Sequence, residues 1–158
     1  MDQPLNTSEL ESMMRALVGS KVFKGVYPSD HLPDTTNFGK PFCLIINEDC
    51  SHRPGTHWNG MYFDEGGGHY FDSYGNPPKK KHWIQFLENN SRSGHWVMQR
   101  RQIQSEFSPF CGHHTALFLY LRHSMPSSFS DYQLMLNVND SNICTKLGNV
   151  LHGYHCDI

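Results

Sequence analysis

The chain has 158 residues, of which 37% are hydrophobic and 18% charged, and this size and composition fit one compact domain. Aromatic residues make up 13% of the chain and only 9 residues are proline, so disordered and collagen-like proteins are excluded. No stretch approaches the roughly 20 apolar residues that cross a bilayer, and the first residues lack a secretion signal, so we expect an intracellular protein without a membrane partner. The net charge of −2 argues against bulk attraction to nucleic acid.

Five cysteines are spread over the chain, and no two of them have CxxC spacing; they are Cys43, Cys50, Cys111, Cys144 and Cys156. A disulfide scaffold would use an even number of cysteines, and a zinc ribbon would use CxxC pairs. The cysteines therefore indicate reduced thiols in an intracellular protein.

The first half of the chain shows one helical and one strand pattern. Residues 8–18 place apolar side chains at i, i+3, i+4 and i+7, which predicts a helix with Ser8 and Glu11 as its capping box. A loop rich in Pro, Asp and Gly then covers residues 27–41. The unbroken apolar run at 42–46 predicts a buried strand, which we expect at the centre of a sheet.

The rest of the chain begins with two aromatic-rich runs, 56–63 and 69–74, which are joined by a glycine-rich turn and predict a hairpin. After them the patterns predict a short helix with Trp83, Phe86 and Leu87 on one side, a strand over 95–103, a buried helix over 112–122, and short helices over 131–136 and 142–151. We therefore expect a single α+β domain over residues 1–158, in which a mixed central sheet packs against the buried helix.

Cys111 follows Ser-Pro-Phe and directly precedes the buried helical run. At the start of a helix, unpaired backbone N–H groups and the helix dipole stabilise a thiolate and can hold an oxyanion. The position therefore suits a nucleophile, because the N-terminal end of the helix would assist it. Cysteine is, however, also often buried for packing alone. Partners for the thiol decide between the two.

Three residues could complete a thiol-based site. His57, at the start of the first hairpin strand, could act as a general base, and Asp72, on the returning strand, comes back beside it if the strands pair. The acidic residues of the hairpin turn are rivals of Asp72, but solvated loop charges are common there. Gln104 lies seven positions before the cysteine, and its amide could donate to an oxyanion.

These residues resemble the site of the adenovirus-type endopeptidases (the adenain family), which are related to the SUMO-specific cysteine proteases. The matching motifs are Thr56-His57-Trp58, Phe71-Asp72-Ser73-Tyr74-Gly75, Gln104 and Cys111-Gly112. Residues 8–18 followed by 23–27 are similar to the opening of the adenovirus enzyme, and residues 137–151 to its later helical region. The resemblance covers most of the chain.

The resemblance implies a cysteine endopeptidase that works through a thioester acyl-enzyme. In it His57 is the base, Asp72 orients the base and Cys111 is the nucleophile, while Gln104 and the cysteine amide form the oxyanion hole and Trp58 narrows the substrate channel. The implied substrates are viral capsid or core precursors, cut for virion maturation at sites such as (Leu/Met/Ile)-x-Gly-Gly or (Leu/Met/Ile)-x-Gly-x. The implied location is the host nucleus and the virion.

Three features separate the two branches of this group. The interval of seven residues from Gln104 to Cys111 is that of the adenovirus type, since the SUMO proteases usually have one residue fewer, and Phe110 replaces their aspartate. Asp72 instead matches the SUMO proteases, because the adenovirus enzyme has a glutamate there. We expect the adenovirus type, with a SUMO- or ubiquitin-like deconjugating protease as the alternative.

The adenovirus enzyme is activated by a peptide, through a disulfide to a cysteine upstream of the nucleophile, and by viral DNA. This sequence has no cysteine between Cys50 and Cys111, and its basic clusters are limited to residues 79–81 and 100–101. The resemblance thus leaves an activating peptide or DNA open, while the residues argue against both. We expect a monomer that needs no cofactor for its chemistry.

Two functions other than proteolysis stay open. One is a metal-binding interaction domain that would draw on the Cys and His residues at positions Cys111, His113, His114, His152, His155 and Cys156. The first three lie within one helical turn and cannot all face one ion, and no C-x(2-4)-C partner is present, so the sequence favours no metal. The other is an inactive protease fold kept as a binding module, against which the complete set of site residues argues.

Overall fold

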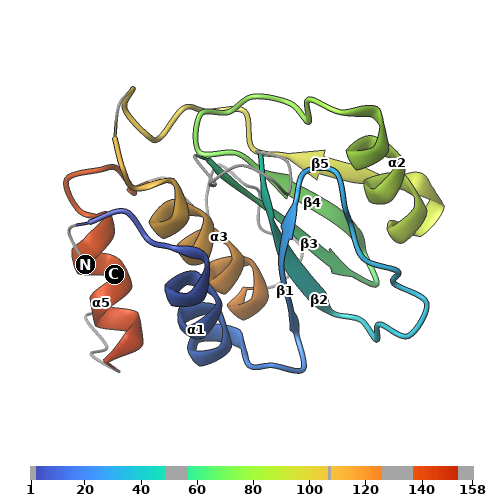
Figure 1. The fold of residues 1–158 in the computed structure, drawn as a ribbon, viewed down its shortest axis with the longest axis horizontal. Helices are drawn as coiled ribbons and strands as arrows, with labels where there is room; N and C mark the ends of the chain where they lie inside the picture. The colour runs from blue at the N-terminus through green and yellow to red at the C-terminus, as the bar shows by residue number, and fades with distance from the viewer. Residues whose placement is uncertain (1–2, 49–56, 107, 126–136, 153–158) are drawn as a thin grey trace.

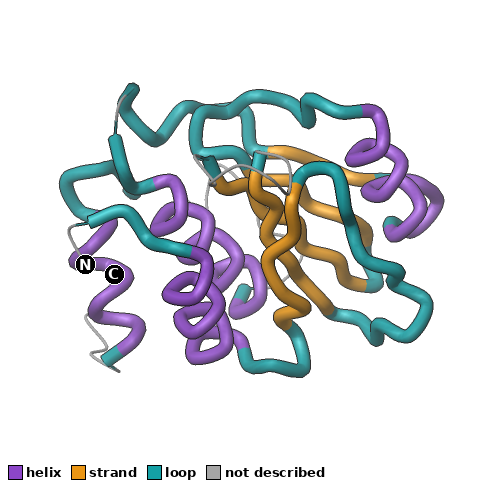
Figure 2. Tube along the Cα trace, viewed as in Figure 1, coloured by secondary structure: helices purple, strands orange, loops and turns teal. Residues whose placement is uncertain are grey.

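A computed structural model of the chain describes residues 3–48, 57–106, 108–125 and 137–152, which form one sheet with helices on both of its faces (Figures 1 and 2). The elements in chain order are α1 (Thr7–Val18), β1 (Phe23–Pro28), β2 (Phe42–Asn47), β3 (Trp58–Asp64), β4 (Gly67–Phe71), α2 (Lys81–Asn90), a 3-10 turn (Arg92–Gly94), β5 (Trp96–Met98), α3 (Cys111–Ser124) and α5 (Ile143–Leu151). Among these helices, none combines the length and the apolar character that crossing a bilayer requires.

The sheet has five strands in the order β1-β2-β3-β4-β5. The pairs β1–β2 and β4–β5 are parallel, whereas β2–β3 and β3–β4 are antiparallel, so the sheet is mixed. The expected α+β class with a mixed sheet and a buried helix is confirmed. The expected central place of the apolar run at 42–46 is wrong: β2 is the second strand and β3 is central, because only β1 lies beyond β2.

Two apolar cores lie on opposite faces of the sheet. Phe42, Leu44 and Ile46 of β2 belong to the core under α2. Cys43 and Ile45 of the same strand belong to the core under α1 and α3, and α5 packs against that same side (Figure 1). Because both faces of the sheet are covered, the side chains of β2 are buried on either face, which explains its continuous apolar sequence.

Helix α3 packs closely on the central strand at Gly60. A Cβ at this glycine would lie 3.1 Å from the methyl carbon of Thr115 and 3.3 Å from the side chain of Leu119. The Thr115 hydroxyl also lies 3.1 Å from the Trp58 carbonyl oxygen at the start of β3. The helix that begins with Cys111 is thus fixed against the strand that follows His57.

Several predicted elements are confirmed with changed ends. The first helix begins at Thr7, and its capping box joins Asn6 and Glu9, so the predicted box of Ser8 and Glu11 is wrong. Asn6 is an equally good cap and lies two residues closer to the chain start. The expected hairpin is present as β3–β4. The expected helix that carries Trp83 is α2, and the helices expected over 112–122 and 142–151 are α3 and α5.

Two further differences concern strands, and one expected helix is not tested. Residues 23–28 form β1, although the sequence indicated a loop from residue 27 onward. The strand expected over 95–103 is reduced to β5, since only its first residues pair with β4. The short helix expected over 131–136 lies outside the described residues.

Candidate active site

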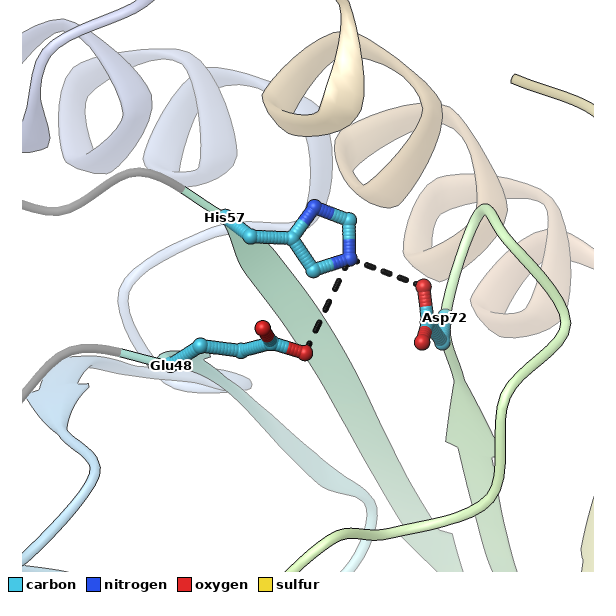
Figure 3. Close-up of side chains that lie close together, drawn as sticks. All are labelled: Glu48, His57 and Asp72. Carbon is cyan, nitrogen blue, oxygen red and sulfur yellow. Dashed lines mark hydrogen bonds and ion pairs between the residues drawn. The ribbon is translucent and has the colours of Figure 1, made fainter. Parts of the chain in front are cut away.

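The hairpin β3–β4 brings His57 and Asp72 together. His57 directly precedes β3 and Asp72 directly follows β4, so antiparallel pairing places both at one edge of the sheet. His57 Nε2 lies 2.8 Å from Asp72 Oδ1 (Figure 3), and both residues are buried. The same carboxylate oxygen accepts a hydrogen bond from the Tyr74 backbone N–H at 2.9 Å, which fixes the orientation of the acid.

Cys111 is the first residue of α3 and is buried, with 7% of its surface exposed. The backbone N–H groups of the first helical turn have no partner within the helix and point out of its N-terminal end. The Thr115 hydroxyl lies 2.8 Å from the Cys111 carbonyl oxygen and, as described above, near the carbonyl of Trp58. This hydroxyl therefore ties the cysteine to the strand end that carries His57.

His57 lies between a carboxylate and a thiol. Burial lowers the pKa of His57, but hydrogen bonds with Asp72 and Cys111 and the charges of both groups raise it to about 9. In Figure 3 the Nε2 atom faces the carboxylates and Nδ1 lies on the opposite side of the ring, so Nδ1 is the atom left for Cys111. The Tyr74 ring stacks on the imidazole with centroids 4.8 Å apart. The arrangement favours a protonated imidazole beside the Cys111 side chain.

Gln104 is buried and is held by the segment that follows Asp72. The Ser73 hydroxyl donates to Gln104 Oε1 at 2.5 Å, and the Ser73 carbonyl accepts from the Gln104 backbone N–H at 3.1 Å. Gln104 Nε2 donates one hydrogen to the Ser108 carbonyl at 2.7 Å, three residues before the cysteine. Because Oε1 is turned to Ser73, the NH₂ group is the end that faces the loop leading to Cys111.

Asp140 organises the loop between Gln104 and Cys111. It accepts hydrogen bonds from the Ser105 backbone N–H at 2.8 Å and from the buried His114 Nε2 at 2.8 Å, and a side-chain hydrogen bond from Ser108 lowers its pKa further. Burial acts on the Asp140 carboxyl in the opposite direction, but the net pKa is lowered. Asp140 was not among the residues expected from the sequence, because it lies 26 positions beyond His114 and follows no motif.

Glu48 is a second residue that the sequence analysis missed. Its Oε1 lies 4.0 Å from His57 Nε2, on the same side of the ring as Asp72 (Figure 3). It follows β2 directly, and its backbone N–H donates to the His57 carbonyl at 3.0 Å. Pairing the apolar run at 42–46 antiparallel to the first hairpin strand would have placed Glu48 opposite His57.

Among the described residues, the group that could hold a metal ion is Glu48, His57 and Asp72, whose ligand atoms lie within 4.8 Å of one another. Its carboxylates already have donors: Glu48 is bonded to Lys79 and Asn59, and Asp72 to His57 and a backbone N–H. These partners fit ion-paired acids better than metal ligands. The Cys and His residues considered for a zinc site do not form such a group where they are described.

Asp64, one of the turn acids weighed as a rival of Asp72, has another role. Asp64 accepts from Arg122 Nη2 at 2.7 Å, and the same guanidinium donates through Nε to His69 Nδ1 at 3.2 Å. The guanidinium carbon also lies 4.7 Å from the centre of the Tyr62 ring. This network joins the hairpin turn to the end of α3, far along the sheet from His57.

The side chains of Trp58 and of the other described cysteines are buried or partly buried. Trp58 is 5% exposed, and its Cδ1 lies 3.3 Å from the point that a Cβ on Gly112 would occupy, next to Cys111 in the chain. Cys43 is fully buried, and burial raises the pKa of its thiol to about 12, so this thiol is not a nucleophile at neutral pH. Cys144 is partly buried. Cys50 and Cys156 lie outside the described residues.

Comparisons with known proteins find a relative in structure only. No protein-family model matches the chain, and no curated protein matches it by sequence. Among solved structures the chain is similar to the ASFV pS273R protease, with a TM-score of 0.51 and 21% identity. The alignment covers 70% of this chain and 43% of that chain, so this chain corresponds to less than half of that protease.

An identity of 21% relates the two proteins by fold. The comparison does not single out the adenovirus branch, which the sequence motifs favoured. The chain has an α+β fold similar to that of the ASFV pS273R protease.

Proposed function

We propose that the protein is a cysteine endopeptidase with His57, Asp72 and Cys111 as its catalytic triad. The observation that carries the proposal is the buried His57, which is bonded to Asp72 at 2.8 Å through Nε2 and also hydrogen-bonded to Cys111 at the start of α3. A buried imidazole between an acid and a thiol is the arrangement that nucleophilic cysteine catalysis requires.

In the proposed reaction the Cys111 thiolate attacks the scissile carbonyl, and the carbon–sulfur bond forms as the carbonyl oxygen becomes an oxyanion. The Cys111 N–H and the Gln104 amide stabilise that oxyanion. The His57 imidazolium protonates the leaving amine, the C–N bond breaks and a thioester remains. His57 then removes a proton from the water that hydrolyses the thioester, and the thiolate–imidazolium pair is restored.

We propose polypeptides with Gly-containing sites, such as (Leu/Met/Ile)-x-Gly-Gly and (Leu/Met/Ile)-x-Gly-x in viral precursor proteins, as the substrates. The motif resemblance to the adenovirus-type enzymes supports this, as does the fold shared with a viral protease. The packing of Trp58 beside Gly112 crowds the start of α3, which favours residues with small side chains next to the scissile bond.

A SUMO- or ubiquitin-like deconjugating protease is the second candidate. The observation that favours it is Asp72, which stands where the adenovirus enzyme has a glutamate and matches the acid of the SUMO proteases. Both candidates use the same chemistry and differ in whether a short peptide or a folded modifier is bound.

The test offers the purified protein two probes under reducing conditions, a peptide with a Leu-x-Gly-Gly site and a SUMO or ubiquitin C-terminal fluorogenic conjugate. We expect cleavage of the peptide, loss of all turnover in Cys111→Ala, and full activity in Cys144→Ala, the matched control. Preference for the conjugate would instead establish the second candidate. Cleavage that survives Cys111→Ala, or no cleavage of either probe with and without added DNA, would refute both.

A further inference from the structure

We propose that Glu48 is a second carboxylate that positions and charges His57, so that the base of this site is supported by two acids instead of one. The inference rests on the proposed function, because it concerns the same imidazole. Glu48 Oε1 lies 4.0 Å from His57 Nε2, and Asp72 Oδ1 lies 2.8 Å from the same atom. Opposite charges at this separation stabilise each other when the ring is protonated.

The contacts of Glu48 hold its carboxylate in this place. Asn59 Nδ2 donates to Oε1, the oxygen nearest His57, at 3.1 Å. Asn59 is fully buried, and within the described residues its amide nitrogen donates to Glu48. A buried amide that serves one carboxylate oxygen indicates a built position, because an unneeded polar side chain would cost free energy there.

Lys79 determines how much of the negative charge of Glu48 acts on His57. Its ammonium lies 3.1 Å from Glu48 Oε2, and the Lys79 side chain is mostly exposed, whereas Glu48 is mostly buried. An exposed ion pair is weak, so Lys79 offsets part of the negative charge and leaves the rest to His57. The other described groups that face His57 are Asp72, the Cys111 thiol and the stacked Tyr74.

Two acids around one base have a consequence for catalysis. The reactive state pairs a thiolate with an imidazolium, and each carboxylate favours the imidazolium. When Asp72 loses its charge, Glu48 remains as the nearest carboxylate and can move closer through its longer side chain. Glu48 should therefore matter more in an Asp72 variant than in the native protein.

The experiment compares Glu48→Gln, Asp72→Asn and the double variant, with Glu88→Gln on the exposed side of α2 as the matched control. The pKa of His57 is read from its ring signals by NMR, and the pH dependence of Cys111 alkylation by iodoacetamide is read by mass spectrometry, both in the presence of a chelator. Neither measurement needs a substrate. The kcat/KM for the peptide probe is then measured against pH.

We expect Glu48→Gln to lower the pKa of His57 by about 0.5 to 1 unit and to move the alkaline limb of the kcat/KM profile down by the same amount. The onset of Cys111 alkylation should move to higher pH, because a less charged imidazole stabilises the thiolate less. The loss in kcat/KM should be about threefold in the native background and about tenfold or more in Asp72→Asn, as coupled groups require. Lys79→Met, an exposed change that leaves the core intact, should raise the pKa of His57, and Glu48→Asp should keep most of the native pKa.

An unchanged pKa of His57 in both Glu48→Gln and Lys79→Met, or equal effects of Glu48→Gln in the two backgrounds, would overturn the inference. The proposed function fails separately. If His57→Gln leaves the pH profile of Cys111 alkylation unchanged, the thiol and the imidazole do not interact, and the proposed function is refuted independently of the result for Glu48.

Discussion

Removing the Asp140 carboxylate tests whether the loop before Cys111 depends on the C-terminal part of the chain. The change Asp140→Ala deletes the acceptor of the Ser105 N–H and of the buried His114 Nε2, each at 2.8 Å. Hydrogen bonds to charged groups contribute about 1.5 to 3 kcal/mol each, and these two are neighbours, so their losses do not simply add. Asp140 has a side-chain exposure of 21%, which lets water replace part of the loss.

We therefore expect Asp140→Ala to lower the free energy of unfolding by about 2 to 4 kcal/mol, which corresponds to a fall in Tm of about 10 °C for a domain of this size. The peptide kcat should fall about tenfold with little change in KM, because the loop positions the Gln104 amide for an oxyanion and not for the ground state.

The assay is thermal unfolding followed by circular dichroism, together with steady-state kinetics below the Tm of each variant. Asp140→Asn keeps one acceptor oxygen and should lose about half as much stability. Asp34→Ala, a change at an exposed turn, is the control and should leave kcat unchanged. A Tm within 2 °C of the native value, or an unchanged kcat in Asp140→Ala, would refute the reasoning.

Two other expectations concern the buried charges. Arg122→Met removes the donor of the hydrogen bonds to Asp64 and His69 and should lower the free energy of unfolding in urea by about 2 to 4 kcal/mol. The exposed change Arg100→Met should leave that free energy almost unchanged, and equal urea midpoints for the two variants would contradict this. Because the fold raises the pKa of His57 from 6.5 to about 9, the protonated ring stabilises the folded protein fully below pH 6.5, and this contribution is lost as the pH rises through 9. Urea midpoints should therefore drop more steeply between pH 7 and 9 in the native protein than in His57→Gln, and parallel curves would count against a raised pKa.

Elements with strong local patterns were predictable from the sequence. The buried helix α3 and the hairpin β3–β4 follow from apolar periodicity and a glycine-rich turn, which act within a few residues. Strand β1 was missed because its short sequence contains a glycine and ends in a proline, both of which are rare in strands. Its place at the sheet edge beside β2 tolerates them, but that place depends on the whole fold.

The candidate site divides in the same way. The hairpin alone brings Asp72 back to His57, so that pair could be expected from the order of the strands. Glu48 follows from the pairing of β2 with β3, which sets it opposite His57, but the sequence alone did not show that these two strands are neighbours. Ser73 meets Gln104, and Asp140 meets Ser105, through contacts between segments that are distant along the chain. Such contacts leave no spacing rule in the sequence, and only the packed structure reveals them.

The close packing at Gly60 gives the site a particular kind of sensitivity. The proposed nucleophile belongs to the helical layer and the proposed base to the sheet, so the gap between sulfur and imidazole depends on how closely the two layers pack. Loops can absorb changes of several tenths of an ångström, but a helix seated on a glycine moves as one body. Residues buried between these layers, which never meet a substrate, thereby become determinants of turnover, and selection for stability and selection for activity act on the same side chains.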